Sequence, residues 1–271
     1  MGNLISLKDA IGEFVHDGDS VALEGFSHLI PFAAGHEIIR RQRRDLTLIR
    51  LVPDLLFDQM IGMGCARKLV FSWAGNPGVG LLHRFREAVE KGWPRPLELE
   101  EHTHGSMAVA YTAGAARLPF GTIRGYPDTD LLKHSPDLSS IECPFTGEKL
   151  TAIRAINPDV TIIHAQRADK DGNVQLWGIL GVQKEAVYAA SRVIVTVEEI
   201  CEKFDPVSGG IVIPSWMLSA VAVAPGGARP SYAHGYYRRN DAFYQEWDAI
   251  SRDRARFLEW IDRNVMECVP A

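Results

Sequence analysis

The stretch HDGDSVALEGFSHLIP, residues 16–31, sets the first expectation about the fold. A polar turn leads into the apolar run 20–24, which is typical of a short buried β-strand. Five residues close this run and begin the loop after it: Glu24, Gly25, Phe26, Ser27 and His28. Ligand sites of α/β sheets gather at the carboxyl ends of the strands, so these five residues are candidate binding residues. Gly25 suits either a turn with positive φ or the close approach of a ligand to its N–H.

Strand-like and helix-like segments alternate along most of the chain. Ser6 and Asp9 predict the start of an amphipathic helix, and Asn76, Pro77 and Gly92 predict the cap, first residue and end of another. Strands are expected at 20–26, 45–52, 68–73, 96–102, 160–168, 173–178, 192–200 and 219–225. Further helices are expected at 33–42, 54–64 and 105–117, with one long final helix across 243–265. This alternation predicts an α/β fold with an open, mostly parallel sheet and helices on both faces.

The length of 271 residues suits a single domain over residues 1–271. The segment from about 118 to 154 is rich in proline, glycine and aspartate, and it predicts an irregular excursion from the sheet. The run DKDGN at 169–173 predicts a hairpin turn between two strands.

Composition argues against several classes of protein. The chain is 46% hydrophobic and 23% charged with a net charge of −5, and its basic cluster at 40–44 is typical of a solvated helix end, so we expect no nucleic-acid binding. No apolar run approaches the roughly 18 residues of a membrane span, and the N-terminus is amphipathic rather than signal-like. Four dispersed cysteines predict reduced thiols and a cytoplasmic protein.

A second candidate loop is SWAGNPGVG, residues 72–80. It follows a predicted strand and precedes a predicted helix, so its glycines and the helix N-terminus could cradle an anion. The same residues also suit an ordinary capped turn. The spacing matches neither a P-loop nor a dinucleotide fingerprint. The candidate binding residues here are Ser72, Gly75, Asn76 and Gly78.

Other polar residues lie at predicted strand ends. His102 and His104 would face one side of a strand, but nothing nearby in the sequence completes a metal site, so no metal is expected. Glu101 is a candidate active-site carboxylate. His164 suits a hydrogen-bonded interior position, and Gln166 could orient a substrate. Four rings near the C-terminal end suit an interface, a pocket wall or packing under the last helix: Tyr232, His234, Tyr236 and Tyr237.

Several blocks together carry a resemblance to a known family. DGDSVALEGFSHLIP resembles the N-terminal signature of the family I coenzyme A transferases, and the similarity continues through CARKLVFSWAGNPGVG, CPFTGEKL, PDVTIIHAQRADKDGNVQLWG and APGGARPSYAHGYY. It covers essentially the whole chain and is closest to the A (alpha) chains of two-chain members. The resemblance implies the fold of that family.

The resemblance also implies a division of labour between two chains. In such enzymes the acyl-CoA is attacked by a glutamate of the B subunit, which passes through an acyl anhydride to a glutamyl-CoA thioester. This chain would then hold no catalytic residue and no permanent cofactor, with the coenzyme A thioester as substrate. Its expected partner is a B (beta) subunit, in an A2B2 or AB assembly. The expected reaction is CoA transfer from succinyl-CoA to a 3-oxo dicarboxylic acid.

The sequence departs from the family signature at two places. Glu24 stands where the family often has the first of two glycines, and the loop between Phe26 and Pro31 is one residue shorter than in glutaconate-specific members. Both changes lie on the acceptor side of the expected site, and they argue for an acceptor acid that is related to glutaconate but different from it. Two alternatives stay open. In the first, the chain belongs to a hydrolase, because ring-opening hydrolases share the fold and use a carboxylate near the position of Glu101. In the second, the chain is a non-catalytic partner that only stabilises the complex.

Overall fold

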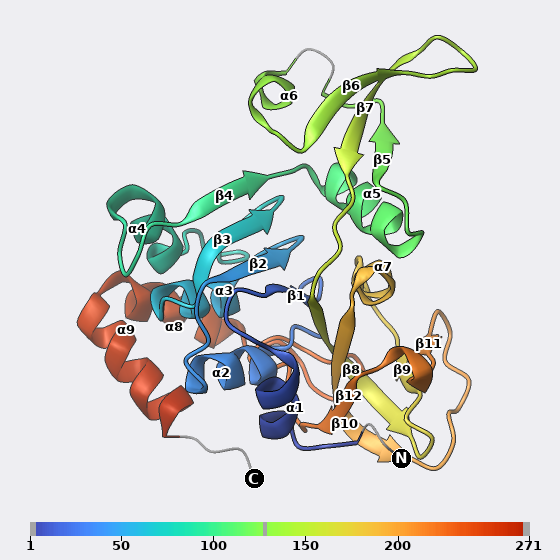
Figure 1. The fold of residues 1–271 in the computed structure, drawn as a ribbon. Coiled ribbons are helices and arrows are strands. Elements are labelled where there is room, and N and C mark those ends of the chain that lie inside the picture. Colours follow the sequence, from blue (N-terminus) through green and yellow to red (C-terminus); the bar gives the residue numbers. More distant parts are fainter. Residues whose placement is uncertain (1–3, 127–128, 268–271) are drawn as a thin grey trace.

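The computed structural model describes residues 4–126 and 129–267, drawn as a ribbon in Figure 1. Over these residues the main sheet has nine strands. They are β1 (Ser20–Glu24), β2 (Leu46–Arg50), β3 (Ala66–Phe71), β4 (Glu98–Glu101), β8 (Val160–Asp169), β9 (Val174–Leu176), β10 (Arg192–Cys201), β11 (Ile211–Ile213) and β12 (Ala220–Val223).

Strand β8 is the centre of this sheet. It pairs in parallel with β1 on one side and β10 on the other, so Ile162 lies opposite both Leu23 and Ile194. Strands β2, β3 and β4 continue in parallel beyond β1, and β12 continues beyond β10. The predicted hairpin turn returns the chain from β8 to β9, which is antiparallel to both β8 and β11. The prediction of an open, mostly parallel sheet is confirmed.

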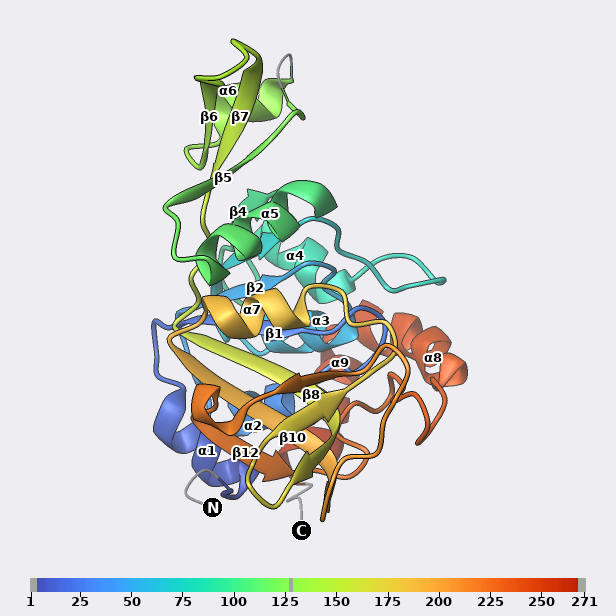
Figure 2. The same ribbon diagram turned by 90° about the vertical axis from the view of Figure 1, so that its right-hand side faces the viewer.

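Helices cover both faces of the sheet, as Figure 2 shows. The described helices are α1 (Leu7–Phe14), α2 (Phe32–Arg40), α3 (Leu55–Gly62), α4 (His83–Lys91), α5 (His104–Ala115), α6 (Asp130–His134), α7 (Gln183–Ala189), α8 (Asp241–Arg252) and α9 (Arg254–Ile261), with a 3₁₀ turn at Ser215–Met217 and a π-helix at Asp262–Met266. Helices α5 and α7 lie on one face, and α1, α2, α3, α8 and α9 pack on the other. No described helix is long and apolar enough to cross a membrane.

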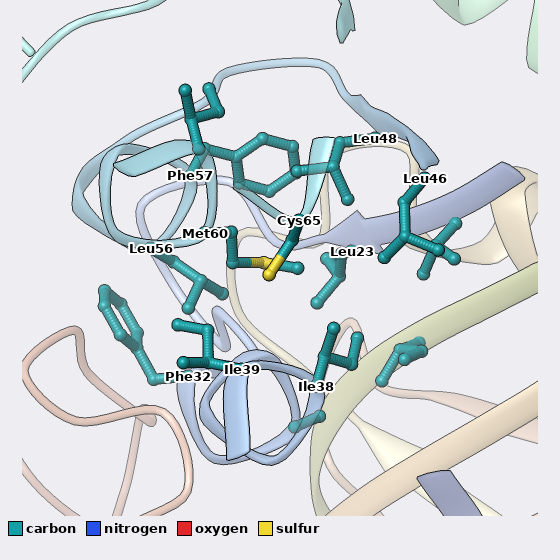
Figure 3. Close-up of a cluster of buried hydrophobic side chains, with 14 of the residues drawn as sticks. Leu23, Phe32, Ile38, Ile39, Leu46, Leu48, Leu56, Phe57, Met60 and Cys65 are labelled. Carbon is teal, nitrogen blue, oxygen red and sulfur yellow. The ribbon is translucent and has the colours of Figure 1, made fainter. Parts of the chain in front are cut away.

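The alternation of side chains along β1 explains the two layers. Val21 and Leu23 belong to the core on the side of α1–α3, whereas Ala22 contacts the core of α5 and α7. Figure 3 shows the larger of these two cores, where apolar side chains from β1, β2, α2 and α3 pack together around Cys65. Cys65, Cys143 and Cys201 are free thiols, as predicted, and Cys268 lies outside the described residues.

Helix α4 does not begin where the sequence predicted. Asn76 is no helix cap: it pairs with Gly80 in a tight turn, and α4 starts at His83. The carboxylate of Asp58 in α3 accepts hydrogen bonds from the backbone N–H groups of Arg84 and Phe85 at 2.8 and 2.9 Å. The cap therefore comes from another helix, while the predicted end at Gly92 is correct, with φ of 67°.

The long final helix predicted over 243–265 is also corrected. It breaks at Asp253, whose backbone is extended and whose side chain accepts a hydrogen bond from the N–H of Arg256 at 2.9 Å. An aspartate at this position caps the new helix α9, so the chain forms two helices and a terminal π-helical turn.

The segment at about 118–154 is more regular than expected. It forms a separate antiparallel sheet of β5 (Phe120–Ile123), β6 (Leu138–Glu142) and β7 (Lys149–Arg154), with α6 beside it. We call these residues the arm, because Figures 1 and 2 both show them projecting from the main body. The hydroxyl of Tyr126 anchors the arm by accepting a hydrogen bond from the N–H of Thr103 at 2.9 Å.

Candidate functional site

Four parallel strands end at one edge of the sheet, and the candidate loops meet there. Strands β1, β2, β3 and β4 end at Glu24, Arg50, Phe71 and Glu101. The loops that follow carry most of the residues singled out from the sequence. Parallel strands present their carboxyl ends to the same edge, which is where α/β proteins place ligands.

His104, the first residue of α5, joins the two candidate loops. Its ring lies edge-on to Phe26 with centroids 6.2 Å apart, and its Nδ1 lies 3.3 Å from the hydroxyl of Ser72. Ser72 also donates a hydrogen bond to the carbonyl of Leu51 at 2.6 Å. The sequence pattern singles out His104 only as a possible metal ligand and gives no sign of this linking role.

Glu24 lies beneath the first loop rather than inside it. Its side chain is buried, and Oε1 accepts hydrogen bonds from the N–H of Leu51 at 3.0 Å and from the hydroxyl of Tyr111 at 2.8 Å. Burial raises the pKa of Glu24 to about 7, although the charge of Arg50 and these hydrogen bonds oppose the rise. The carboxyl group of Glu24 therefore supports the loop from behind.

Gly25 is required by the backbone that approaches it. A Cβ at this position would lie 2.7 Å from the carbonyl oxygen of Leu29 and 2.8 Å from that of His28. Gly25 has no positive φ; the left-handed residues are Ser27, at 57°, and Leu29, at 52°. Of the two explanations drawn from the sequence, a positive-φ turn is wrong. The loop folds back on Gly25 and holds two non-glycine residues in a costly conformation.

His28 is buried and neutral. Its ring packs against that of Tyr232 at a tilt of 48°, with centroids 4.7 Å apart, and its Nε2 accepts a hydrogen bond from the N–H of His234 at 2.9 Å. Burial lowers the pKa of His28 to about 4, against a backbone hydrogen bond with Ile179. Since Nε2 is engaged as an acceptor, His28 fixes the loop against 231–234.

The second loop, 72–80, is built from turns. Gly78 has φ of 81° and faces open space, while the side-chain amide of Asn76 is buried and donates to the carbonyl of Tyr244 at 2.7 Å. The N–H of Gly75 donates to the carbonyl of Pro53 at 3.2 Å. The predicted anion cradle at the N-terminus of α4 is wrong, because Asp58 already occupies that helix end. An anion bound here could therefore contact residues of the loop 72–80 but not these N–H groups of α4.

Glu101 and the two nearby histidines do not form one cluster. Glu101 ends β4 and is exposed, whereas His102 is buried with its Nε2 2.8 Å from Glu100. Although burial alone would raise the pKa of Glu100, hydrogen bonds from His102 and Lys68 lower it to about 2. The described residues hold no group of three or more histidine, cysteine or acidic side chains placed to bind a metal.

Gln166 and His164 lie inside the molecule on β8. The side-chain amide of Gln166 donates to the carbonyl of Trp177 at 3.0 Å and accepts from its N–H at 3.2 Å. His164 lies between Thr196, at 2.8 Å, and Glu198, at 2.7 Å, so its interior position is confirmed. Glu198 was not singled out from the sequence, although two consecutive acidic residues in an apolar strand were a visible signal.

The C-terminal rings form a pocket wall. Tyr232, His234, Tyr236 and Tyr237 line a cavity of about 470 Å³ together with Arg238 and Arg239. Arg239 Nη2 donates to the carbonyl of Pro77 at 2.6 Å, which connects this wall to the second loop. Of the options left open by the sequence, the structure shows the pocket wall, while an interface role stays a prediction.

Comparison with known proteins agrees with this arrangement. The model of the family described as Coenzyme A transferase matches residues 4–224. The chain belongs to the coenzyme A transferase family. It is 59% identical over 265 residues to the A subunit of the 3-oxoadipate CoA-transferase of Pseudomonas knackmussii, covering 98% of this chain and 94% of that protein.

Two further relatives of this coenzyme A transferase show how far the similarity reaches. The crystal structure of glutaconate coenzyme A-transferase from Acidaminococcus fermentans superposes with a TM-score of 0.90 at 31% identity, covering 99% of this chain and 90% of that one. The cholesterol ring-cleaving hydrolase IpdA subunit of Rhodococcus jostii is 27% identical, over 90% of this chain and 85% of that protein. Proteins similar to this chain are therefore named for more than one class of reaction, so the reaction has to be argued from the residues of the site and not from the fold.

Proposed function

We propose that this chain is the A subunit of a two-chain CoA-transferase that moves CoA from succinyl-CoA to a 3-oxo dicarboxylic acid, 3-oxoadipate. The observation that carries the proposal is the 59% identity, over 98% of the chain, to the A subunit of a 3-oxoadipate CoA-transferase. The expected partner is a B subunit in an A2B2 assembly in the cytoplasm.

The proposed chemistry begins on the partner. The thioester carbonyl of succinyl-CoA is attacked by a glutamate carboxylate of the B subunit, the C–S bond breaks, and an acyl anhydride and CoA thiolate form. The thiolate then attacks the glutamyl carbonyl and releases succinate, leaving a glutamyl-CoA thioester. The acceptor acid takes the CoA by the same two steps in reverse.

The A subunit would bind and orient the reactants in this scheme. Phe26, Ser27, Ser72 and Gly78 are the candidate residues with exposed or half-buried surface, and we assign them contacts with the thioester and the acid. The other candidates support their loops through backbone contacts: Glu24, Gly25, His28, Gly75, Asn76 and Gln166. Such preorganised groups favour a reaction in which negative charge develops on oxygen.

A hydrolase that uses Glu101 is the second candidate. It is favoured by the exposure of Glu101 at the same sheet edge, three residues before His104 at the start of α5. The 27% identity to a ring-cleaving hydrolase subunit is much lower than the identity to the transferase subunit, so the hydrolase ranks below the 3-oxoadipate transferase. A glutaconate-type transferase ranks below 3-oxoadipate for the same reason.

The test is intact-mass measurement of the co-purified complex after incubation with succinyl-CoA and no acceptor acid. A CoA adduct on the B subunit, with this chain unmodified, is the expected result. Free CoA without an adduct on either chain would show that water takes the acyl group and that the complex hydrolyses the thioester, and Glu101→Gln would then be expected to abolish CoA release. An adduct on this chain would show that the nucleophile lies here rather than on the partner, and it would overturn the proposed mechanism.

A further inference from the structure

Arg50, at the end of β2, is a buried arginine that the proposed reaction does not yet use. Its side chain is only 1% exposed, and its guanidinium lies over the ring of Phe57 at 5.6 Å. Nη1 donates to Asp54 at 2.8 Å, and Nη2 donates to the carbonyl of Gly25, also at 2.8 Å. A fully buried guanidinium with a carboxylate partner is costly to place, so its position beneath a candidate loop requires an explanation.

The contacts of Arg50 and Glu24 are reciprocal. Arg50 of β2 holds the backbone carbonyl of Gly25 after β1, while Glu24 of β1 holds the backbone N–H of Leu51 after β2. The backbone pairing of β1 with β2 ends at Ala22 and Ile49. Beyond that point the side chains of Arg50 and Glu24 take the place of backbone hydrogen bonds, and they fix the loop after β1 to the loop after β2.

The Gly25 carbonyl shares its peptide unit with the N–H of Phe26. In a trans peptide the two groups point in opposite directions, so the N–H of Phe26 is directed away from the buried guanidinium. Among the described residues, no group accepts a hydrogen bond from this N–H. The positively charged guanidinium of Arg50, which donates to this carbonyl, also polarises the peptide and makes its N–H a stronger donor.

We propose that Arg50 is a positioning residue that holds the Gly25–Phe26 peptide so that the N–H of Phe26 donates to the oxyanion formed on the thioester carbonyl. This inference rests on the proposed function. Asp54 restrains the guanidinium and accepts a hydrogen bond from the N–H of Leu56 at the start of α3, which ties the arrangement to a rigid element.

Two variants of the A–B complex test the assignment. Arg50→Lys keeps a charge beside Asp54, but an ammonium lacks the planar fork that bridges both partners. The double variant Arg50→Met with Asp54→Asn removes both charges of this ion pair, so neither partner is left behind as an unpaired buried ion. Arg84→Lys is the matched control, because Arg84 is also buried and lies over the rings of Trp93 and Phe257, away from the loops.

Both Arg50 variants are expected to lower kcat about 10- to 100-fold, the scale of a misplaced reacting group, with KM for succinyl-CoA nearly unchanged. Amide exchange of residues 25–29 is expected to accelerate in both. Arg84→Lys is expected to leave kcat and this exchange unaltered. Equal kcat in the Arg50 and Arg84 variants, or a loss confined to KM, would overturn the inference.

The exchange measurement separates this inference from the proposed function. If the wild-type complex transferred no CoA, the proposed function and the oxyanion role would both fall. Faster exchange of 25–29 in the Arg50 variants alone would still support the loop-positioning contact. Unchanged exchange of residues 25–29 in the Arg50 variants would show that Arg50 does not position this loop.

Discussion

At the scale of single residues, Glu24 is expected to make folding stability depend on pH. Its pKa is about 7 in the folded chain against 4.5 for an ordinary glutamate, so the unfolded state releases its proton first as pH rises. Stability from this group is therefore lost between about pH 4.5 and 7. Relative to wild type, Glu24→Gln should gain about 1–3 kcal/mol in free energy of unfolding from pH 5 to pH 8. Urea denaturation at both pH values measures this, and an equal difference at both would contradict it.

Single residues also show what sequence could predict of the site. The strand end at Glu24–Gly25 and the choice of the loop after it as a candidate site followed from local pattern. The roles within the loop did not, because they depend on partners far along the chain: Leu51 for Glu24 and Tyr232 for His28. Arg50 gave no signal, since a charged residue at the end of an apolar strand is usually solvated.

At the scale of elements, the cap of α4 gives the clearest test. Asp58 accepts hydrogen bonds from the N–H groups of Arg84 and Phe85 and from Trp247 Nε1 at 3.0 Å, so it joins α3, α4 and α8. Asp58→Ala leaves these buried donors unpaired and should cost about 2–4 kcal/mol in chemical denaturation. Asp248→Ala, which removes a half-buried partner of His83, should cost less than about 1 kcal/mol. Comparable losses in the two variants would refute the cap.

The same elements explain where sequence patterns fail. Asn76 followed by proline has the local chemistry of a helix start, but the decisive acceptor comes from α3, and no short window contains both. The break at Asp253 could have been predicted locally, because aspartate is one of the residues preferred at a helix N-cap. The apolar spacing from Phe243 to Val265 continued through it and concealed the break.

At the scale of the whole molecule, the open, mostly parallel sheet followed from the alternation of strands and helices, but the order of its strands and the fold of the arm did not. Its strands have weak apolar patterns, because β6 has only Leu138 buried and the arm pairs mainly with itself. In the arm, Tyr126, Leu138 and Ile153 join the core of α5 and α7, and Ile123, Leu131 and Leu132 are partly buried against it. Strands such as β5 and β6, whose residues are mostly exposed or half-buried, leave little trace in hydrophobic periodicity.

This uneven burial predicts the order in which parts of the molecule open. Strand β8 is almost wholly buried, and β10 is buried over residues 193–198, whereas α6 has no buried residue and Phe145, beyond β6, is 93% exposed. Local opening requires less free energy where fewer apolar contacts are lost. In hydrogen–deuterium exchange of the isolated chain, peptides from 130–149 should exchange well before those from 160–168 and 192–198. Equal protection of the arm and the central strands would show that the arm is held by contacts beyond those with the core of α5 and α7.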